Sequence, residues 1–202
     1  NKSIAFLRQR DTNGDGKADW NDNGELWVLN LASRKEECLT EDMTHARTHT
    51  WHPSLQQIAF VAGGRGQDKV LYIHDVPSGK RHQVIQGVRN WLTWSLDGAY
   101  IAFFDKHNRV ALTSPDGKET KTLSDDVGNS LALYWTYDNS LFFSHEKLGW
   151  QIYEPKENKL TRLDKERRAR LTTPPDQHIY DWANKGTQKP PASESLKAAP
   201  EE

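Results

Sequence analysis

The stretch "WSLDGAYIAF" (residues 94–103) decides the fold, because related stretches begin at two other tryptophans of the chain. "WHPSLQQIAF" begins at Trp51 and "WTYDNSLFF" at Trp135, so the tryptophan recurs about every forty residues. In the first two copies, a short turn leads from the tryptophan to Ile-Ala-Phe at 58–60 and 101–103. The third copy has a slightly shorter turn. Such a period indicates one structural unit copied along the chain.

Two more apolar stretches follow each copy. They are "VLYIHDV" (70–76), "RVALTSP" (109–115) and "WQIYEP" (150–155), and then "RHQVIQ" (81–86), "TKTLS" (120–124) and "LTRLD" (160–164). Each unit therefore predicts four short strands joined by turns such as Leu-Asp-Gly and Pro-Asp-Gly. A β-sandwich is the alternative, but it needs no fixed period. We predict an all-β fold, a β-propeller of four-stranded antiparallel blades.

The two ends of the chain look like parts of one blade. "NKSIAFLRQR" (1–10) matches an Ile-Ala-Phe strand without a tryptophan strand before it, and "IYDWANKG" (179–186) matches a tryptophan strand without the next strand. Because a closed ring leaves no open sheet edge, we expect 179–186 to complete the blade begun by 1–40. This gives about four blades in a propeller over 1–186. The alternative is that the chain forms the C-terminal part of a larger ring.

After this predicted strand, residues 187–202 are rich in Pro, Ala, Ser, Glu and Lys and predict a disordered tail. The chain begins at Asn1 without a methionine or a signal peptide, so we expect a processed or truncated N-terminus.

The repeat resembles a known family. Trp-Ser-x-Asp-Gly-x-x-Ile-Ala-Phe, followed by a strand like "VLYIHDV" and a short strand ending in Leu-Ser, resembles the TolB-like (WD-repeat-like) propeller repeat, with residues 94–124 as the best copy. Related blades occur in the periplasmic TolB protein, in propeller domains of prolyl-oligopeptidase-like and tricorn-like peptidases, and in some oligogalacturonate lyases. The resemblance therefore implies an architecture and leaves several functions open.

The segment "DTNGDGKADWND" (11–22) has the ligand spacing of an EF-hand calcium loop, with Gly16 at the sharp bend. Its last position is aspartate, as in dockerin loops, and a strand at 25–31 follows it instead of a helix. TolB-like propellers sometimes carry such insertions between the second and third strands of a blade. The alternative is an acidic hairpin that binds nothing. The predicted calcium ligands are the side chains of Asp11, Asn13, Asp15, Asp19 and Asp22 and the backbone carbonyl of Lys17.

We expect this calcium ion (Ca²⁺) to be structural. A catalytic metal keeps an open coordination position, whereas one short loop would saturate the ion. An affinity in the extracellular range, roughly 0.1–1 mM, favours an extracytoplasmic location, periplasmic or secreted.

Four histidines lie near the predicted innermost strands. Such strands line a propeller's channel, where lyases of this fold hold a transition metal. His49 and His52 fall on opposite faces of a strand, however, so we expect hydrogen-bonded or solvated histidines. Metal binding by these side chains stays open. The four are His45, His49, His52 and His178.

Composition limits the other functions. The chain has 202 residues and a net charge of −1, which argues against a nucleic-acid binder. It has no apolar run long enough for a transmembrane segment, and its single cysteine, Cys38, excludes an internal disulfide framework. Neither a Gly-x-Ser-x-Gly elbow nor a phosphate-binding loop is present.

These features favour a non-enzymatic protein–protein interaction scaffold in a cell-envelope assembly, possessing no catalytic residues and no cofactor other than calcium. We expect its channel-mouth loops to bind a protein partner within a larger complex. The alternative is the propeller of a metal-dependent lyase, or the substrate-gating propeller of a peptidase whose catalytic domain is absent from this chain.

Overall fold

The computed structural model describes residues 3–12, 14–19, 22, 24–43, 45–63, 68–129 and 132–164. The chain divides into two units, Asn1–Arg162 and Leu163–Glu202, and every strand of the described residues belongs to the first unit. The predicted closing strand (179–186) and the predicted tail (187–202) lie outside the described residues. Within the described part, no helix is long and apolar enough to cross a membrane.

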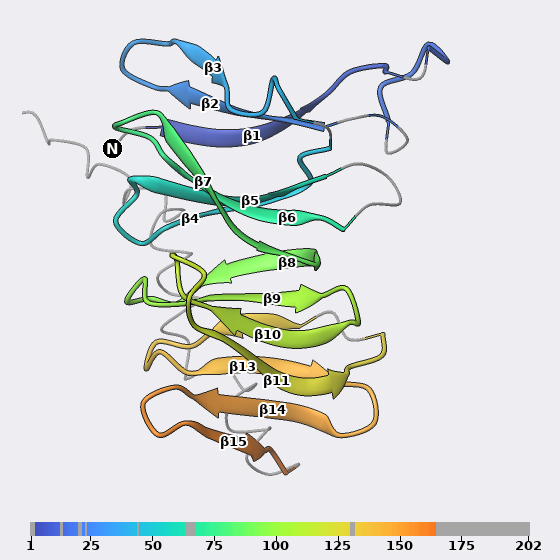
Figure 1. Cartoon of the computed structure of the whole chain (residues 1–202), viewed down its shortest axis with the longest axis vertical. Helices are drawn as coiled ribbons and strands as arrows, with labels where there is room; N and C mark the ends of the chain where they lie inside the picture. Colours follow the sequence, from blue (N-terminus) through green and yellow to red (C-terminus); the bar gives the residue numbers. More distant parts are fainter. Residues whose placement is uncertain are drawn as a thin grey trace, which may run out of the picture. The chain divides into compact units, whose positions relative to one another are not determined.

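The strands form antiparallel sheets that follow one another in chain order (Figure 1). The first sheet is β1-β2-β3 (Ser3–Gln9, Gly24–Asn30, Glu36–Cys38). The second is β4-β5-β6-β7 (Thr48–Trp51, Gln57–Ala62, Val70–Asp75, Lys80–Gln86). The third is β8-β9-β10-β11 (Val88–Trp94, Ile101–Asp105, Arg109–Thr113, Thr120–Asp126). The fourth is β12-β13-β14-β15 (Leu133–Trp135, Leu141–His145, Gly149–Glu154, Lys159–Arg162).

The prediction of four-stranded units is confirmed for the second, third and fourth sheets. The first sheet has three strands among the described residues, and they correspond to the last three strands of the other sheets. The first strands of neighbouring sheets contact one another, β4 with β8 and β8 with β12.

Packing between the sheets explains the Ile-Ala-Phe motif. Side chains alternate between the two faces of a strand. In β5, Ile58 and Phe60 pack in one cluster with Leu26 of the first sheet, whereas Ala59 packs in another cluster with Ile101 of the third sheet. The large side chains thus face the preceding sheet, and the small alanine lets the following sheet approach. Burial of each isoleucine stabilises the fold by about 1.5–3 kcal/mol.

Ile4 of β1 is an exception to this burial of the isoleucines. Its equivalents Ile58 and Ile101 are fully buried, but Ile4 is 48% exposed. It lies on the face of the first sheet that points away from the second sheet. On the same sheet, the Arg8 guanidinium lies 4.2 Å from the centroid of the Trp27 ring, a cation–π contact. This face therefore presents both apolar and cationic groups.

The Trp-Ser-x-Asp-Gly turn has its own physical basis. In the third sheet, Asp97 Oδ1 accepts hydrogen bonds from Ser95 Oγ at 2.7 Å and from the Ala99 amide at 3.0 Å. Gly98 has a φ of +73°, and a side chain there would overlap the ring of His52. The aspartate thus closes the turn, and the glycine permits both its conformation and the approach of the neighbouring sheet.

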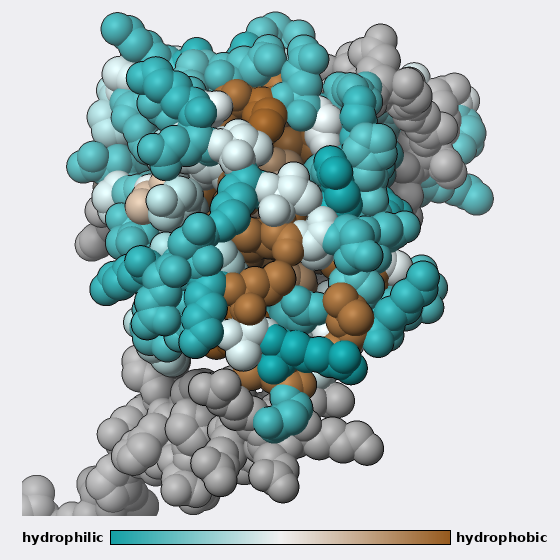
Figure 2. All heavy atoms as spheres, turned by 60° about the horizontal axis from the view of Figure 1, so that its bottom comes forward, coloured by the Kyte–Doolittle hydropathy of each residue, from teal (hydrophilic) through white to brown (hydrophobic). Residues whose placement is uncertain are grey.

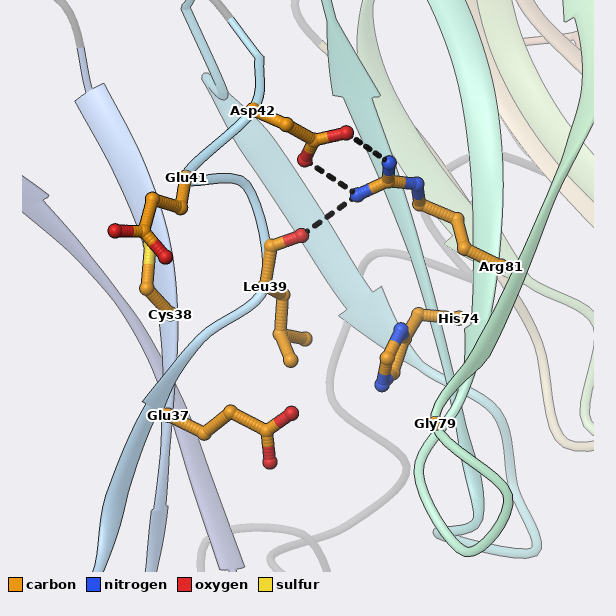
Figure 3. Close-up of a pocket in the computed structure, with 8 residues that line it drawn as sticks. All are labelled: Glu37, Cys38, Leu39, Glu41, Asp42, His74, Gly79 and Arg81. Atoms are coloured by element: carbon orange, nitrogen blue, oxygen red, sulfur yellow. Dashed lines mark hydrogen bonds and ion pairs between the residues drawn. The ribbon is translucent and has the colours of Figure 1, made fainter.

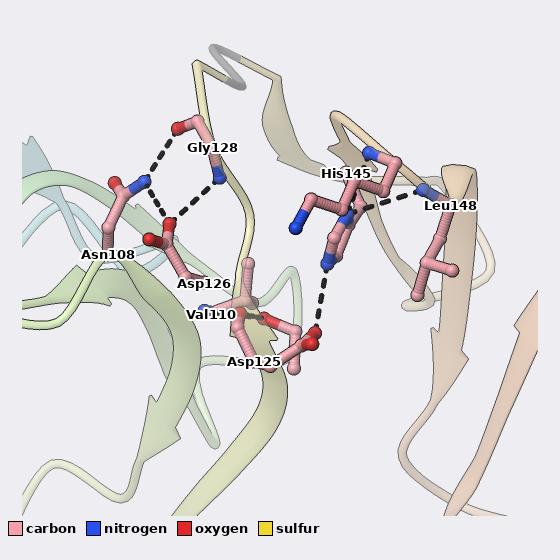
Figure 4. Close-up of polar contacts among 9 residues, drawn as sticks. Asn108, Val110, Asp125, Asp126, Gly128, His145 and Leu148 are labelled. Carbon is pink, nitrogen blue, oxygen red and sulfur yellow. Dashed lines mark hydrogen bonds and ion pairs between the residues drawn. The ribbon is translucent and has the colours of Figure 1, made fainter.

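A buried histidine joins the third and fourth sheets (Figure 4). The amides of Lys147 and Leu148 donate to Nδ1 of His145 at 3.2 and 3.3 Å. The other ring nitrogen, Nε2, therefore carries the proton and donates to Asp125 Oδ1 at 2.9 Å. This hydrogen bond lowers the pKa of Asp125. It holds β11 against β13.

Candidate functional site

The loop between β1 and β2 contains the predicted calcium-binding segment, and its own carboxylates organise it. Asp11 accepts hydrogen bonds from the amides of Gly14 at 2.7 Å and Gly16 at 2.8 Å, one on each oxygen. Both glycines have a left-handed φ, +76° and +82°. The Lys17 amide donates to Asp15 Oδ1 at 2.9 Å. The N-terminal half of the loop therefore wraps around the Asp11 carboxylate.

Asp22 closes the other end of the loop. Its Oδ1 accepts from the Thr12 amide at 2.8 Å and the Thr12 hydroxyl at 3.2 Å, and its Oδ2 accepts from the Asp19 amide at 2.8 Å. Asp22 is only 3% exposed. The last predicted ligand thus ties the start of the loop to its end.

These hydrogen bonds order the loop, but they do not bring its carboxylates together into a metal site. Within the described part of the chain, no group of three or more His, Cys, Asp or Glu side chains is placed to hold a metal ion. Each carboxylate oxygen has two acceptor positions, and Asp22 Oδ1 already accepts from both the amide and the hydroxyl of Thr12. Oxygen-only donors are the type that calcium prefers. Asn13 lies outside the described residues, and calcium binding stays a prediction.

The predicted channel histidines have separate surroundings. His49 Nε2 lies 3.2 Å from the carbonyl oxygen of Ala5, and burial lowers the pKa of His49. His52 Nδ1 lies 2.7 Å from the hydroxyl of Ser54, and the His52 ring packs edge-on against Trp94 with 4.7 Å between centroids. The structure therefore places these two histidines in structural contacts.

His45 lies elsewhere, in the wall of a pocket of about 410 Å³. This pocket, called the Trp91 pocket, is lined by residues that include Leu7 of β1, Asp22, Thr48 of β4 and Trp91 of β8. His45 is buried and has a φ of +55°. The predicted calcium loop therefore forms part of the pocket wall through Asp22. His178 lies outside the described residues.

Trp91 is the residue of this pocket that the repeat pattern did not single out. It has a φ of +56° and is 46% exposed. It lies at a bulge, where the pairing of β8 with β9 shifts register between Asn90 and Leu92. A bulky residue in this conformation stores about 1–3 kcal/mol of strain, which is typical of functional positions. The available signal was a second tryptophan shortly before Trp94 of the repeat.

Hydrophobic side chains are accessible at the surface. Figure 2 shows them in a band between hydrophilic side chains on the face turned toward the viewer. Leu7, 38% exposed, and Trp91 both line the Trp91 pocket. The pocket therefore combines exposed apolar area with the polar groups of Asp22 and His45.

Comparisons with known proteins agree on the architecture. No protein-family model and no curated protein sequence matches the chain. Among solved structures, TolB from Acinetobacter baumannii matches with 17% identity and a TM-score of 0.59, over 80% of this chain and 41% of that one. The β-propeller domain of the Trilobed protease from Pyrococcus furiosus matches with 12% identity and a TM-score of 0.57, over 82% and 54%. The described sheets are β-propeller blades.

A putative TolB from Agrobacterium tumefaciens also matches, with 14% identity and a TM-score of 0.54, over 71% of this chain and 57% of that one. At these identities the similarity shows the fold alone. The chain spans less than two thirds of the length of each of these structures.

Proposed function

We propose that this propeller is a non-enzymatic protein-interaction module of an extracytoplasmic, cell-envelope assembly. The observation that carries the proposal is Trp91, an exposed tryptophan held in a strained conformation inside a pocket. Tryptophan is enriched at the energetic centres of protein interfaces. A half-exposed aromatic ring on a strained backbone within a rigid sheet is pre-organised to bind a partner side chain.

The partner would be a protein that contacts the loops around the Trp91 pocket. Leu7 and Trp91 lie within β1 and β8, and residues 45–47 lead into β4, so the sheets fix the positions of the binding residues. The structural similarity to TolB supports a role in the cell envelope.

The loop at residues 11–22 is proposed to bind one structural calcium ion. Binding would require the Asp15 and Asp19 carboxylates to approach Asp11, whose oxygens already order the loop. Because Asp22 lines the Trp91 pocket, calcium would stiffen one wall of the interaction site. With the expected affinity of roughly 0.1–1 mM, the site would be filled outside the cytoplasm and mostly empty inside, which is why we propose an extracytoplasmic location.

Site-specific cross-linking in cells tests the interaction. Photo-reactive benzoylphenylalanine replaces Trp91 in one variant and Leu160 of the outermost strand β15 in the matched control, since the two side chains are 46% and 42% exposed. We expect an adduct with a protein of defined mass at position 91 and none at position 160. No adduct at position 91, or the same adduct at both positions, would contradict the proposal.

Metal analysis of the purified protein tests the non-enzymatic role separately. We expect no stoichiometric transition metal. Stoichiometric zinc or manganese that disappears on His49→Gln would instead support a metal-dependent lyase.

A further inference from the structure

A second pocket, of about 670 Å³, lies between the first and second sheets, away from Trp91. Its walls include Glu37 of β3, Leu39, His74 of β6, and Arg81 of β7. Figure 3 shows the Glu37 carboxylate and the His74 ring pointing into the space between the two sheets from opposite sides. We call it the Glu37–His74 pocket.

His74 is the unusual group in this pocket. It is only 6% exposed, and its ring nitrogens have no hydrogen-bond partner among the described residues. Burial lowers the pKa of His74, so the ring is neutral at pH 7 and offers one nitrogen lone pair as an acceptor. The fully buried, unpartnered polar side-chain atoms of the described residues include no His74 nitrogen, so the ring nitrogens reach the open space of the pocket, where a ligand can bind them.

In the third and fourth sheets, the side chain at the position equivalent to His74 has a hydrogen-bond partner. His74 pairs in register with Ile58, as Thr113 pairs with Ile101 and Tyr153 with Leu141. The Thr113 hydroxyl lies 3.2 Å from the Thr120 hydroxyl. The Tyr153 hydroxyl donates to Asn158 Oδ1 at 2.9 Å. Only in the second sheet does this buried polar position lack a partner among the described residues.

A lysine occupies the equivalent place between the third and fourth sheets. Lys121 follows the register Ala102–Leu112–Lys121. Its ammonium group donates to the Tyr153 hydroxyl at 3.1 Å and to Asn158, and lies 4.7 Å from the centroid of the Tyr153 ring.

In the first sheet the matching register is Ala5–Val28–Glu37, so Glu37 stands where the third sheet has Lys121. The first sheet therefore has a carboxylate acceptor, Glu37, where the third sheet has the ammonium donor of Lys121.

The charge of the pocket also favours a cation. The Arg81 guanidinium donates to the Leu39 carbonyl at 2.8 Å and pairs with Asp42 at 2.7 Å, so its charge is already balanced. Glu37 has no ion pair among the described residues. The Glu37 carboxylate thus faces a neutral imidazole, and both are acceptors.

We propose that the Glu37–His74 pocket binds a primary ammonium group, the side chain of a lysine from a protein partner. Its N–H groups would donate to the Glu37 carboxylate and to the free ring nitrogen of His74, as Lys121 donates to acceptors in the equivalent place. The site is separate from the Trp91 pocket, so either proposal can fail alone.

The test uses Nα-acetyl-lysine amide as the probe and the imidazole NMR signals of His74 as the readout, in the full chain. We expect the signals to shift and saturate at millimolar probe. Glu37→Gln should weaken the binding at least tenfold. Glu37→Lys should abolish it, because the new ammonium group would occupy the pocket as Lys121 does in its own. Glu119→Gln, in the equivalent pocket near Lys121, is the matched control and should bind normally.

The same probe acetylated at Nε has no charge and should leave the His74 signals unchanged. Any of three results would overturn the proposal: no response to the charged probe, an equal response to the acetylated probe, or an unchanged affinity in folded Glu37→Gln. A response of His74 to zinc ions without a response to the amine would also overturn it, in favour of a metal site.

Discussion

The β1–β2 and β9–β10 hairpins occupy the same place in their sheets and are closed in different ways. The loop of the third sheet, residues 106–108, is closed by Asp105, which accepts from the amides of His107 at 2.9 Å and Arg109 at 2.8 Å. The Arg109 side chain pairs with the same carboxylate at 2.7 Å. The loop of the first sheet, residues 10–23, is closed by Asp11 and Asp22 through backbone amides.

The two hairpins differ in whether a nearby basic side chain balances the charge of the carboxylates that close them. The short hairpin carries its own cation, the Arg109 guanidinium. The long hairpin carries Asp11, Asp15, Asp19 and Asp22 against two basic residues, Lys17 and Arg10, and Arg10 pairs with Glu25 at 3.2 Å. Repulsion among nearby carboxylates opposes a compact loop unless a cation is present. The short loop is therefore self-sufficient, and we infer that the long loop depends on calcium from solution.

The largest expected effect on the free energy of unfolding comes from a substitution in the short β9–β10 hairpin. Asp105→Ala removes a carboxylate that is only 9% exposed and leaves two backbone amides and a guanidinium without their acceptor. We expect a loss of about 3 kcal/mol in the free energy of unfolding, measured by urea denaturation. The loss should be equal with and without calcium. A loss that depends on calcium would break the contrast between the two hairpins.

Calcium itself should have the next largest effect. With a dissociation constant of roughly 0.1–1 mM, calcium at about 10 mM should stabilise the folded protein by about 1.4–2.7 kcal/mol. Urea denaturation with and without calcium measures this difference. In Asp15→Ala the difference should vanish, while magnesium at the same concentration should stabilise the wild type less. Equal stabilisation of both proteins would locate the ion elsewhere.

Gly16→Ala should have a smaller effect. The glycine has a φ of +82°, and no atom lies within 4 Å of the position a β-carbon would take, so the cost is conformational alone, about 1 kcal/mol. It should appear in the calcium-bound protein and shrink without calcium, because a less ordered loop relaxes the strain. Thermal unfolding under both conditions would show this. An equal cost in both would mean that the loop has the same conformation without the ion.

The smallest effect concerns the attachment of the first sheet to the second through His49 and Ala5. Burial lowers the pKa of His49 below its ordinary value of 6.5. The unfolded chain therefore binds the proton first, and stability present above pH 6.5 is lost as the pH falls. His49→Gln should reduce the slope of stability against pH in this range, measured by urea denaturation at a series of pH values. Equal slopes in the wild type and the variant would contradict this role.

The repeat made the blades predictable. Trp51, Trp94 and Trp135 marked the first strands of three sheets, and the Ile-Ala-Phe period gave the second strands. The second strands were readable because they are buried on both faces, so that their neighbours restrict the side chains. The exposed edge strands gave weaker signals, since fewer contacts constrain their residues.

The sites were less predictable for a physical reason. The Trp91 pocket depends on a bulge and a left-handed backbone, which no periodicity encodes. His74 stands at a position where its equivalents are Thr113 and Tyr153, and only the register of the folded sheets reveals that its ring lacks a partner. Motif spacing identified the acidic loop, but spacing does not determine whether its carboxylates converge.

Calorimetric titration of the purified protein with calcium tests the central claim most directly. We predict binding at one site per chain with a dissociation constant of roughly 0.1–1 mM, abolished by Asp15→Ala and unchanged by Asp116→Ala in a hairpin of the third sheet. No heat of binding in the wild type, or binding that persists in Asp15→Ala, would contradict the account of a calcium-stabilised propeller.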